Sequence, residues 1–196
     1  MGSLLIASPM RLEAALIRSA ARGASVHRTG MGARRSRAAA ATLMSEPGDA
    51  LLVLGFCGGL DERARPGDVV VATEVWATTD DRDDGERIRC DGAGELAAAV
   101  AGQGMRVRCG AVVSVARLAL GERRAQLHAA GAIAVDMESA WLAPGAAGRP
   151  FGVVRVVLDS PSRELLRPGI AISAPTAAAA LRRVAAAAVH GWVPGG

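Results

Sequence analysis

The chain has 196 residues, of which 51% are hydrophobic and 21% charged, and a formal net charge of +4 at pH 7. This length and composition allow one hydrophobic core without disulfides or structural metals. All 23 basic residues are arginines, which excludes Schiff-base chemistry on lysine and phosphate-binding loops that use a lysine. The tightest arginine group, Arg34, Arg35 and Arg37, is typical of a solvated helix face, so we expect no nucleic-acid partner.

The cysteines and the first residues of the chain indicate the cellular compartment of the protein and whether it binds a metal or cofactor. Cys57, Cys90 and Cys109 lie far apart and form no CxxC pair. This spacing indicates neither a disulfide framework nor a zinc site, and we expect no metal and no cofactor. The first residues lack the basic segment of a secretory signal, and no apolar run approaches the roughly 20 residues that a bilayer requires. We therefore expect a cytoplasmic protein.

Strands and helices alternate from the beginning of the predicted pattern. Residues 4–7 form an apolar run typical of a strand, and residues 10–21 carry apolar side chains at helical spacing. Residues 25–29 and 33–44 repeat the order of strand and helix around a glycine turn. The continuous apolar run at residues 51–54 predicts a strand buried on both faces, which opens into a tight loop of glycines.

The alternation continues after a polar interruption. Residues 78–94 are rich in aspartate, arginine and glycine and predict a mobile loop. Further strands are predicted at residues 69–72, 105–115, 132–135 and 151–157. Further helices are predicted at residues 95–101, 122–130 and 175–190, together with one after residue 138 that Pro144 ends or kinks.

This alternation predicts an α/β fold with three layers, in which helices cover both faces of a largely parallel central sheet, as a single domain over residues 1–196. Ligands of such sheets bind where the strands end. Three predicted strand ends deliver a carboxylate: Glu13, Glu138 and Asp159. Cleavage of a glycosidic bond needs an acid on one side and a water-activating base on the other.

Each of these acids also has a purely structural interpretation. Glu13 fits an exposed position on an amphipathic helix, Asp159 fits the cap of a turn, and Glu138 fits a helix N-terminus. Their joint placement at strand ends favours a shared cleft.

Several motifs resemble the methylthioadenosine/adenosylhomocysteine nucleosidases and their phosphorylase relatives. Residues 55–60 (GFCGGL) and 65–71 (RPGDVVV) resemble their glycine loop and the following strand. Residues 134–139 (AVDMES) resemble their V(D/E)ME motif, and residues 155–159 (RVVLD) their R-x-x-S-D segment. Residues 8–13 (SPMRLE) resemble their N-terminal A-M-x-x-E. The resemblance implies one nucleoside phosphorylase-like domain that cleaves a purine from a ribosyl group.

The resemblance also implies roles for the acids. Glu13 would activate the attacking water, and Met137 and Glu138 would hold the ribose. Asp159 would protonate the purine at N7 or hydrogen-bond to it.

Further residues are implied to bind the substrate. Cys57 and Gly58 would approach the sugar or the nucleophile through their backbone, where a side chain would block the approach. Phe56 and Arg155 complete the predicted substrate-binding set.

Three departures from the family pattern concern the binding of the purine and of the 5′ side of the nucleoside. Leu158 stands where the family has serine, Phe56 stands where it has serine or threonine, and residues 114–118 lack its phenylalanine. Together with the Ala- and Arg-rich composition, these features resemble the hopanoid-associated branch. The resemblance implies release of adenine from adenosylhopane to leave ribosylhopane.

A phosphorylase is the nearest alternative, with Arg28, Arg34 or Arg35 as ligands of phosphate near a glycine turn. Glu13 argues against it, because a carboxylate at the nucleophile site repels phosphate.

Two other classes remain open. A cysteine hydrolase would use Cys57 with His27, His128 or His190 as base. A nucleoside-binding protein without turnover is compatible with the Leu158 and Phe56 departures. The three acids Glu13, Glu138 and Asp159 argue against it, because binding alone would not need all of them.

The expected partners are a small-molecule nucleoside and a second copy of the chain in a homodimer. The segment at residues 175–193, with Arg182, Arg183 and Trp192, has two interpretations. It could lie at a membrane surface during transient contact, or it could pack on the sheet of its own domain, as Ala-rich terminal helices usually do.

Overall fold

The computed structural model describes residues 3–78, 85–161 and 170–192, and of residues 170–173 the backbone alone. In chain order the elements are β1 (Leu4–Ser8), α1 (Arg11–Ala20), β2 (Ser25–Arg28), α2 (Ala33–Leu43), β3 (Ala50–Gly59), β4 (Val69–Ala77), β5 (Ile88–Arg89), α3 (Ala93–Ala101), β6 (Val107–Ser114), α4 (Glu122–Ala129), β7 (Ala132–Asp136), α5 (Ser139–Leu142), the 3-10 helix η1 (Ala143–Ala146), β8 (Phe151–Asp159) and α6 (Ile170–Gly191).

The strands form one mixed sheet in which parallel pairs prevail. In the described residues its order is β2-β1-β3-β7-β6-β4-β5, and β8 pairs with both β3 and β4. Strand β8 runs parallel to β3 and antiparallel to β4, whereas β7 runs parallel to β6 and antiparallel to β3. Because β4 also pairs with β6, strands β3, β8, β4, β6 and β7 close into a ring.

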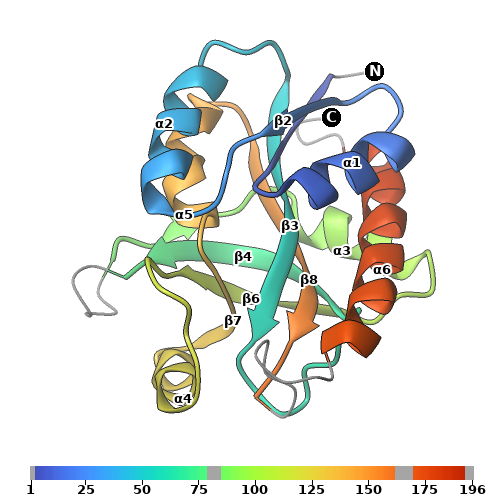
Figure 1. The fold of residues 1–196 in the computed structure, drawn as a ribbon. Helices are drawn as coiled ribbons and strands as arrows, with labels where there is room; N and C mark the ends of the chain where they lie inside the picture. Colours follow the sequence, from blue (N-terminus) through green and yellow to red (C-terminus); the bar gives the residue numbers. More distant parts are fainter. Residues whose placement is uncertain (1–2, 79–84, 162–169, 193–196) are drawn as a thin grey trace.

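Helices cover both faces of the sheet (Figure 1). Helices α1, α3 and α6 lie on one face, and α2 and α5 lie on the other. The core beneath the first group includes Ile17, Leu96 and Leu181, and the core beneath the second includes Leu43 and Leu142. This arrangement confirms the predicted α/β fold.

Strand β3 continues through the glycine-rich segment, so the predicted tight loop is wrong. A Cβ atom at Gly55 would lie 2.7 Å from Glu13 Oε1 and 2.8 Å from Arg155 Nη1. At Gly58 it would lie 2.9 Å from Arg124 Nη2. Glycine is required here because buried side chains approach the backbone, although the chain does not turn.

The polar segment at residues 78–94 is more ordered than the sequence predicts. Strand β5 pairs with β4 in an antiparallel manner, and α3 begins within the segment at Ala93. Residues 79–84 of the predicted loop lie outside the described residues. The guanidinium of Arg87 lies 3.9 Å from the centre of the Trp76 ring and also pairs with Glu74, which anchors this corner of the sheet.

Helix α6 packs its apolar face on the sheet. It begins at Ile170, earlier than predicted. Arg182 and Arg183 are exposed, but Trp192 is 3% exposed and belongs to the core. Of the two interpretations of this segment, packing on the sheet of its own domain is confirmed, because the apolar side chains of the helix are buried. Transient contact with a membrane surface stays a prediction. None of the helices in the described part of the chain has the length and hydropathy of a membrane span.

Candidate functional site

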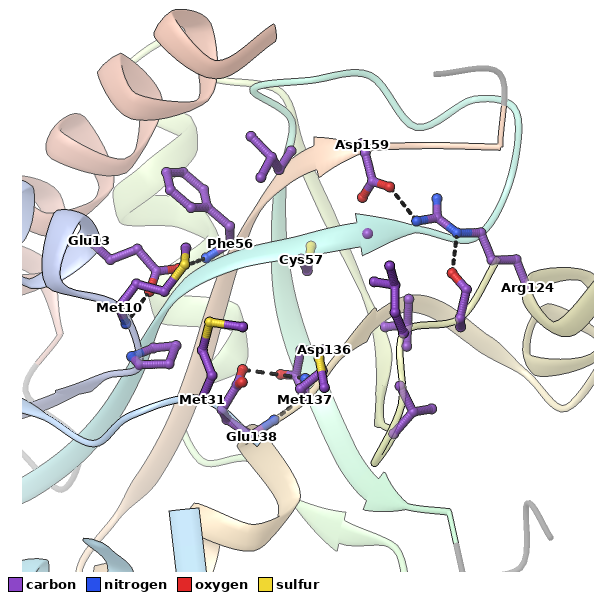
Figure 2. Close-up of a pocket in the computed structure, with 17 residues that line it drawn as sticks. Met10, Glu13, Met31, Phe56, Cys57, Arg124, Asp136, Met137, Glu138 and Asp159 are labelled. Atoms are coloured by element: carbon purple, nitrogen blue, oxygen red, sulfur yellow. Dashed lines mark hydrogen bonds and ion pairs between the residues drawn. The ribbon is translucent and has the colours of Figure 1, made fainter. Parts of the chain in front are cut away.

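A cavity of about 160 Å³ opens where β1, β3, β7 and β8 end (Figure 2). The three predicted strand ends that deliver a carboxylate all contribute to its wall. From the predicted site, the residues that line the cavity are Glu13, Phe56, Cys57, Gly58, Met137, Glu138 and Asp159.

Glu13 enters the cavity from the first turn of α1. Its Oε2 atom accepts a hydrogen bond from the Met10 backbone N at 2.8 Å, and Oε1 accepts one from the Phe56 backbone N at 2.7 Å. The residue is 1% exposed, so the interpretation as an exposed helix residue is wrong. Burial raises the pKa of Glu13, although the hydrogen bond from Phe56 and the charge of Arg155 act in the opposite direction.

Glu138 approaches the same cavity from the residue before α5. Its Oε1 atom accepts a hydrogen bond from the Gly32 backbone N at 3.2 Å, at the N-terminus of α2. Its Oε2 atom lies 3.6 Å from Arg155 Nη2. Burial raises the pKa of Glu138 to about 7, with a smaller contribution in the same direction from the negative charge of Asp136. Glu138 can therefore gain or lose a proton near neutral pH.

A buried polar network supports Glu138 from behind. Arg155 is fully buried, and its Nη2 atom lies 2.8 Å from Asp136 Oδ2. Asp136 Oδ1 accepts hydrogen bonds from the Ser114 hydroxyl at 2.6 Å and from the Glu138 backbone N at 3.1 Å. Burial opposes the charge of Arg155, but Asp136 and Glu138 outweigh it and raise the pKa of Arg155. The network fixes the chain on either side of Met137.

Arg155 does not occupy the position that the sequence predicts for it. It lies behind the pocket wall and is absent from the cavity lining. Its link to the cavity is Glu138, whose Oε2 atom lies 3.6 Å from Arg155 Nη2.

Asp159 lies across the cavity from Glu13 (Figure 2). It is the last residue of β8, is 2% exposed, and pairs with the guanidinium of Arg124. Arg124 comes from α4 and is also 2% exposed. Asp159 therefore does more than cap a surface turn, because it forms part of a buried ion pair in the pocket wall.

The rest of the wall is mainly apolar. Phe56 and Leu158 are half-buried and also contact the core. Met31, which follows the glycine turn after β2, is 47% exposed, and Leu118 is 48% exposed. Among the described residues, Phe56 is the one aromatic side chain that lines this cavity.

Three residues of the site were not predicted from the sequence, and they differ in how much signal the sequence contains for them. Asp136 belongs to the AVDMES motif, and its place at the end of a buried strand is a signal for a structural carboxylate. Arg124 carries no such signal, because Arg123 beside it shares the same predicted helix. Met31 reaches the cavity only because the turn after β2 lies against Glu138.

Cys57 lacks the environment of a nucleophile. Burial raises the pKa of its thiol, which disfavours the reactive thiolate. Among the described residues no histidine lines this cavity, and His128 instead bonds through Nδ1 to the Ala132 carbonyl at 2.9 Å. The described residues therefore give Cys57 no histidine partner, which the cysteine-hydrolase alternative requires.

The arginines considered for phosphate lie beside the cavity, not in it. Arg28 and Arg35 line an adjoining hollow that shares Met10 and Met31 with the cavity, and Arg34 is exposed. The backbone N–H of Gly32, at the N-terminus of α2, donates to the carboxylate of Glu138, which lines the cavity. A carboxylate thus occupies the helix N-terminus that phosphate would need.

Comparisons with solved structures agree with the fold. A methylthioadenosine/adenosylhomocysteine nucleosidase from Neisseria meningitidis, in complex with methylthio-immucillin-A, superposes with a TM-score of 0.80 and 22% identity, covering 95% of this chain and 98% of its own. The corresponding enzyme from Colwellia psychrerythraea, in complex with adenine, gives 0.79 and 20% over 96% and 95%. The futalosine hydrolase of Helicobacter pylori gives 0.73 and 18% over 96% and 94%.

Sequence comparison gives the family. No curated protein sequence matches the chain. The family model described as the Phosphorylase superfamily matches residues 13–190, a span that contains all the acids of the cavity. The chain therefore belongs to the phosphorylase superfamily.

Proposed function

We propose that this chain hydrolyses the N-glycosidic bond of a purine nucleoside. The observation that carries the proposal is the placement of two buried carboxylates, Glu13 and Asp159, on opposite sides of one cavity, with Glu138 on a third part of the wall (Figure 2). Hydrolysis through an oxocarbenium-like transition state needs separate groups for the attacking water and for the leaving base. The cavity provides both.

Glu13 is proposed as the base that accepts a proton from the attacking water. Two backbone N–H groups hold its carboxylate in place, so little reorganisation is needed when the water attacks. Its raised pKa brings the carboxylate closer to the working pH, which improves a general base.

Glu138 and Met137 are proposed to hold the ribose. The carboxyl group of Glu138 can accept hydrogen bonds from sugar hydroxyls, and Met137 can pack against the apolar face of the ring. Asp136 fixes both residues by accepting from the Glu138 backbone N. The phosphorylase superfamily match covers this segment.

Asp159 is proposed to act on the leaving base. In this proposal Asp159 donates a proton to N7 of the purine or accepts a hydrogen bond from the protonated N7. Either interaction lets the purine leave as a neutral molecule. The nucleosidase from Colwellia psychrerythraea, which has a similar fold, was solved in complex with adenine, which supports adenine as the released base.

Water is proposed as the acceptor in place of phosphate. Glu13 would repel an anion at the position from which the nucleophile attacks. The neighbouring arginines, Arg28 and Arg35, belong to the adjoining hollow.

The proposed natural substrate is adenosylhopane, which would yield adenine and ribosylhopane. The sequence resemblance to the hopanoid-associated branch supports this choice. The apolar lining of the cavity supports it as well, because two of its large side chains are exposed, Met31 at 47% and Leu118 at 48%. A lipid tail would cover such side chains favourably.

The test is release of free adenine from adenosine, methylthioadenosine and adenosylhopane, each with and without phosphate. We expect release without phosphate, and fastest release from adenosylhopane. Dependence on phosphate would contradict hydrolysis, whereas a faster reaction with methylthioadenosine would contradict the lipid-tailed substrate alone. If no nucleoside yields adenine, the proposed function is wrong.

Cytoplasmic location and a homodimer are part of the same proposal. Light scattering during gel filtration measures the second, and a monomeric mass would contradict it.

A further inference from the structure

Asp159 binds a side chain that the sequence does not predict as its partner. Leu158 precedes it in the chain and has no polar side-chain atom that could fix a carboxylate. In the structure, Arg124 Nη2 instead donates a hydrogen bond to Asp159 Oδ2. The two residues are 35 positions apart and both are 2% exposed.

The guanidinium of Arg124 is itself fixed by two backbone carbonyls. Its Nε atom donates to Ala119 O at 2.9 Å, and Nη1 donates to Gly59 O at 3.3 Å. These carbonyls belong to the loop before α4 and to the end of β3. Arg124 thus links three segments and presents Nη2 to Asp159 in one orientation.

Strand β3 leaves space for the Arg124–Asp159 pair at Gly58. The register between β3 and β8 shifts between Cys57 and Gly58, so that Gly58 faces Asp159. A Cβ atom at Gly58 would lie 2.9 Å from Arg124 Nη2 and 3.0 Å from Asp159 Oδ1. The space that glycine leaves is filled by the two charged groups.

Stability alone does not account for the pair. Removing two charges from water costs about as much as their attraction returns, and well-packed apolar residues are often as stable or more stable in the same place. The pair also lines the cavity on the side of the leaving base. A buried ion pair in a pocket wall is typical of a functional role.

We propose that Arg124 is a positioning residue that orients the Asp159 carboxyl group toward the leaving purine. This inference rests on the proposed nucleosidase function. Arg124 acts through Asp159, and its effect is therefore confined to substrates whose leaving group needs that carboxyl group.

Two substrates with different leaving groups separate this role from a structural one. The first is the adenine nucleoside that the wild type cleaves fastest, whose base needs Asp159. The second is 4-nitrophenyl β-riboside, whose nitrophenolate leaves without protonation. The variants are Arg124→Met, Arg124→Lys, Asp159→Asn and the double variant, which leaves no buried charge without a partner. The matched control is Arg108→Met, which breaks the Arg108–Asp61 pair outside the cavity.

We expect Arg124→Met to lower kcat on the adenine nucleoside by about 10²-fold, the order of an acid–base contribution, and to change kcat on the nitrophenyl riboside by less than about threefold. Arg124→Lys should recover part of the loss. The double variant should be no slower than Asp159→Asn, because both changes remove the same interaction. Arg108→Met should leave the ratio of the two rates unchanged.

Equal losses on both substrates, or additive losses in the double variant, would show that Arg124 only supports the fold. Calorimetry of free adenine binding tests the positioning role of Arg124 independently of turnover. Weaker adenine binding in both Arg124→Met and Asp159→Asn supports the inference even if the wild type cleaves no nucleoside, an outcome that rejects the proposed function alone. Unchanged adenine binding in Arg124→Met, or no adenine binding by the wild type, overturns the inference.

Discussion

The acids of the cavity are held by different kinds of donor. Glu13 binds two backbone N–H groups, Glu138 binds one N–H at the start of α2 and lies near a buried arginine, and Asp159 pairs with Arg124. Carboxyl groups of similar intrinsic acidity therefore experience different surroundings. Such differences allow one site to contain a base, a sugar ligand and a group that serves the leaving base.

Glu13 and Asp159 should both be required for turnover. We expect Glu13→Gln and Asp159→Asn each to lower kcat by ~10² to 10⁴, because each removes one acid–base group and keeps the shape of the side chain. The measurement is adenine release under saturating nucleoside, with circular dichroism to verify the fold. Near-normal kcat in either variant would remove that residue from the mechanism.

Glu138 should make stability depend on pH. The pKa of Glu138 is about 7 in the folded protein, compared with 4.5 for a glutamate without interactions, as in the unfolded chain. As the pH rises, the folded state therefore keeps a proton that the unfolded state has already lost. Stability should therefore fall between about pH 4.5 and about pH 7, and Glu138→Gln should remove part of this fall. The measurement is the Tm of both proteins at about pH 5 and about pH 7.5.

The exposed Glu62 provides the control for this experiment, since Glu62→Gln should not alter the change in Tm with pH. A Tm that changes with pH equally in wild type and Glu138→Gln would contradict the assignment to Glu138.

At the scale of elements, Arg149 joins the end of α2 to η1. Its guanidinium donates to the carbonyls of Leu43, Glu46 and Gly48 and, on the other side, to those of the η1 residues Gly145 and Ala146. Leu43 ends α2 and Gly145 and Ala146 end η1, where carbonyls lack the hydrogen bond that a further helical turn would give. Glu46 and Gly48 belong to the connection that follows α2. One side chain thus satisfies the ends of two elements that cover the same face of the sheet.

Arg149→Met should destabilise the protein without affecting catalysis. We expect a loss of about 2–3 kcal/mol in the free energy of unfolding, because hydrogen bonds from a charged group to half-buried carbonyls are lost. Urea unfolding measures the loss, and Arg22→Met, on the exposed turn after α1, is the control. A change in kcat would indicate that α2 also controls the cavity, through Gly32.

At the scale of the whole molecule, the ring of strands and α6 together hold the site in place. The ring brings the ends of β3, β7 and β8 to one cavity. On the opposite side of the ring, α6 closes the core with Trp192, and a Cβ atom at Gly152 would lie 2.8 Å from its indole ring. The last turn of the helix is therefore fitted to β8.

Trp192→Ala should cost about 3–5 kcal/mol of stability, since it removes a large buried side chain and leaves a cavity. The control is His190→Ala, an exposed position in the same part of the helix. Thermal and urea unfolding measure both. A loss below about 1 kcal/mol in Trp192→Ala would mean that the end of α6 does not contribute to the core.

The sequence by itself determined the alternation of strands and helices, and with it the edge of the sheet where Glu13, Glu138 and Asp159 lie. Hydrophobic periodicity reports burial along one element at a time, and this was sufficient for the α/β fold. Hydrophobic periodicity was not sufficient at β3, because glycines in a sequence do not reveal whether they belong to a strand or to a turn.

Only the tertiary structure decided which groups surround each acid. The bond from Gly32 to Glu138 joins residues 106 positions apart, and the pair of Arg124 with Asp159 spans 35. No local pattern encodes such contacts, because they depend on how separate elements pack. The raised pKa values follow from the same packing, since burial by distant segments removes the water that would stabilise the charge.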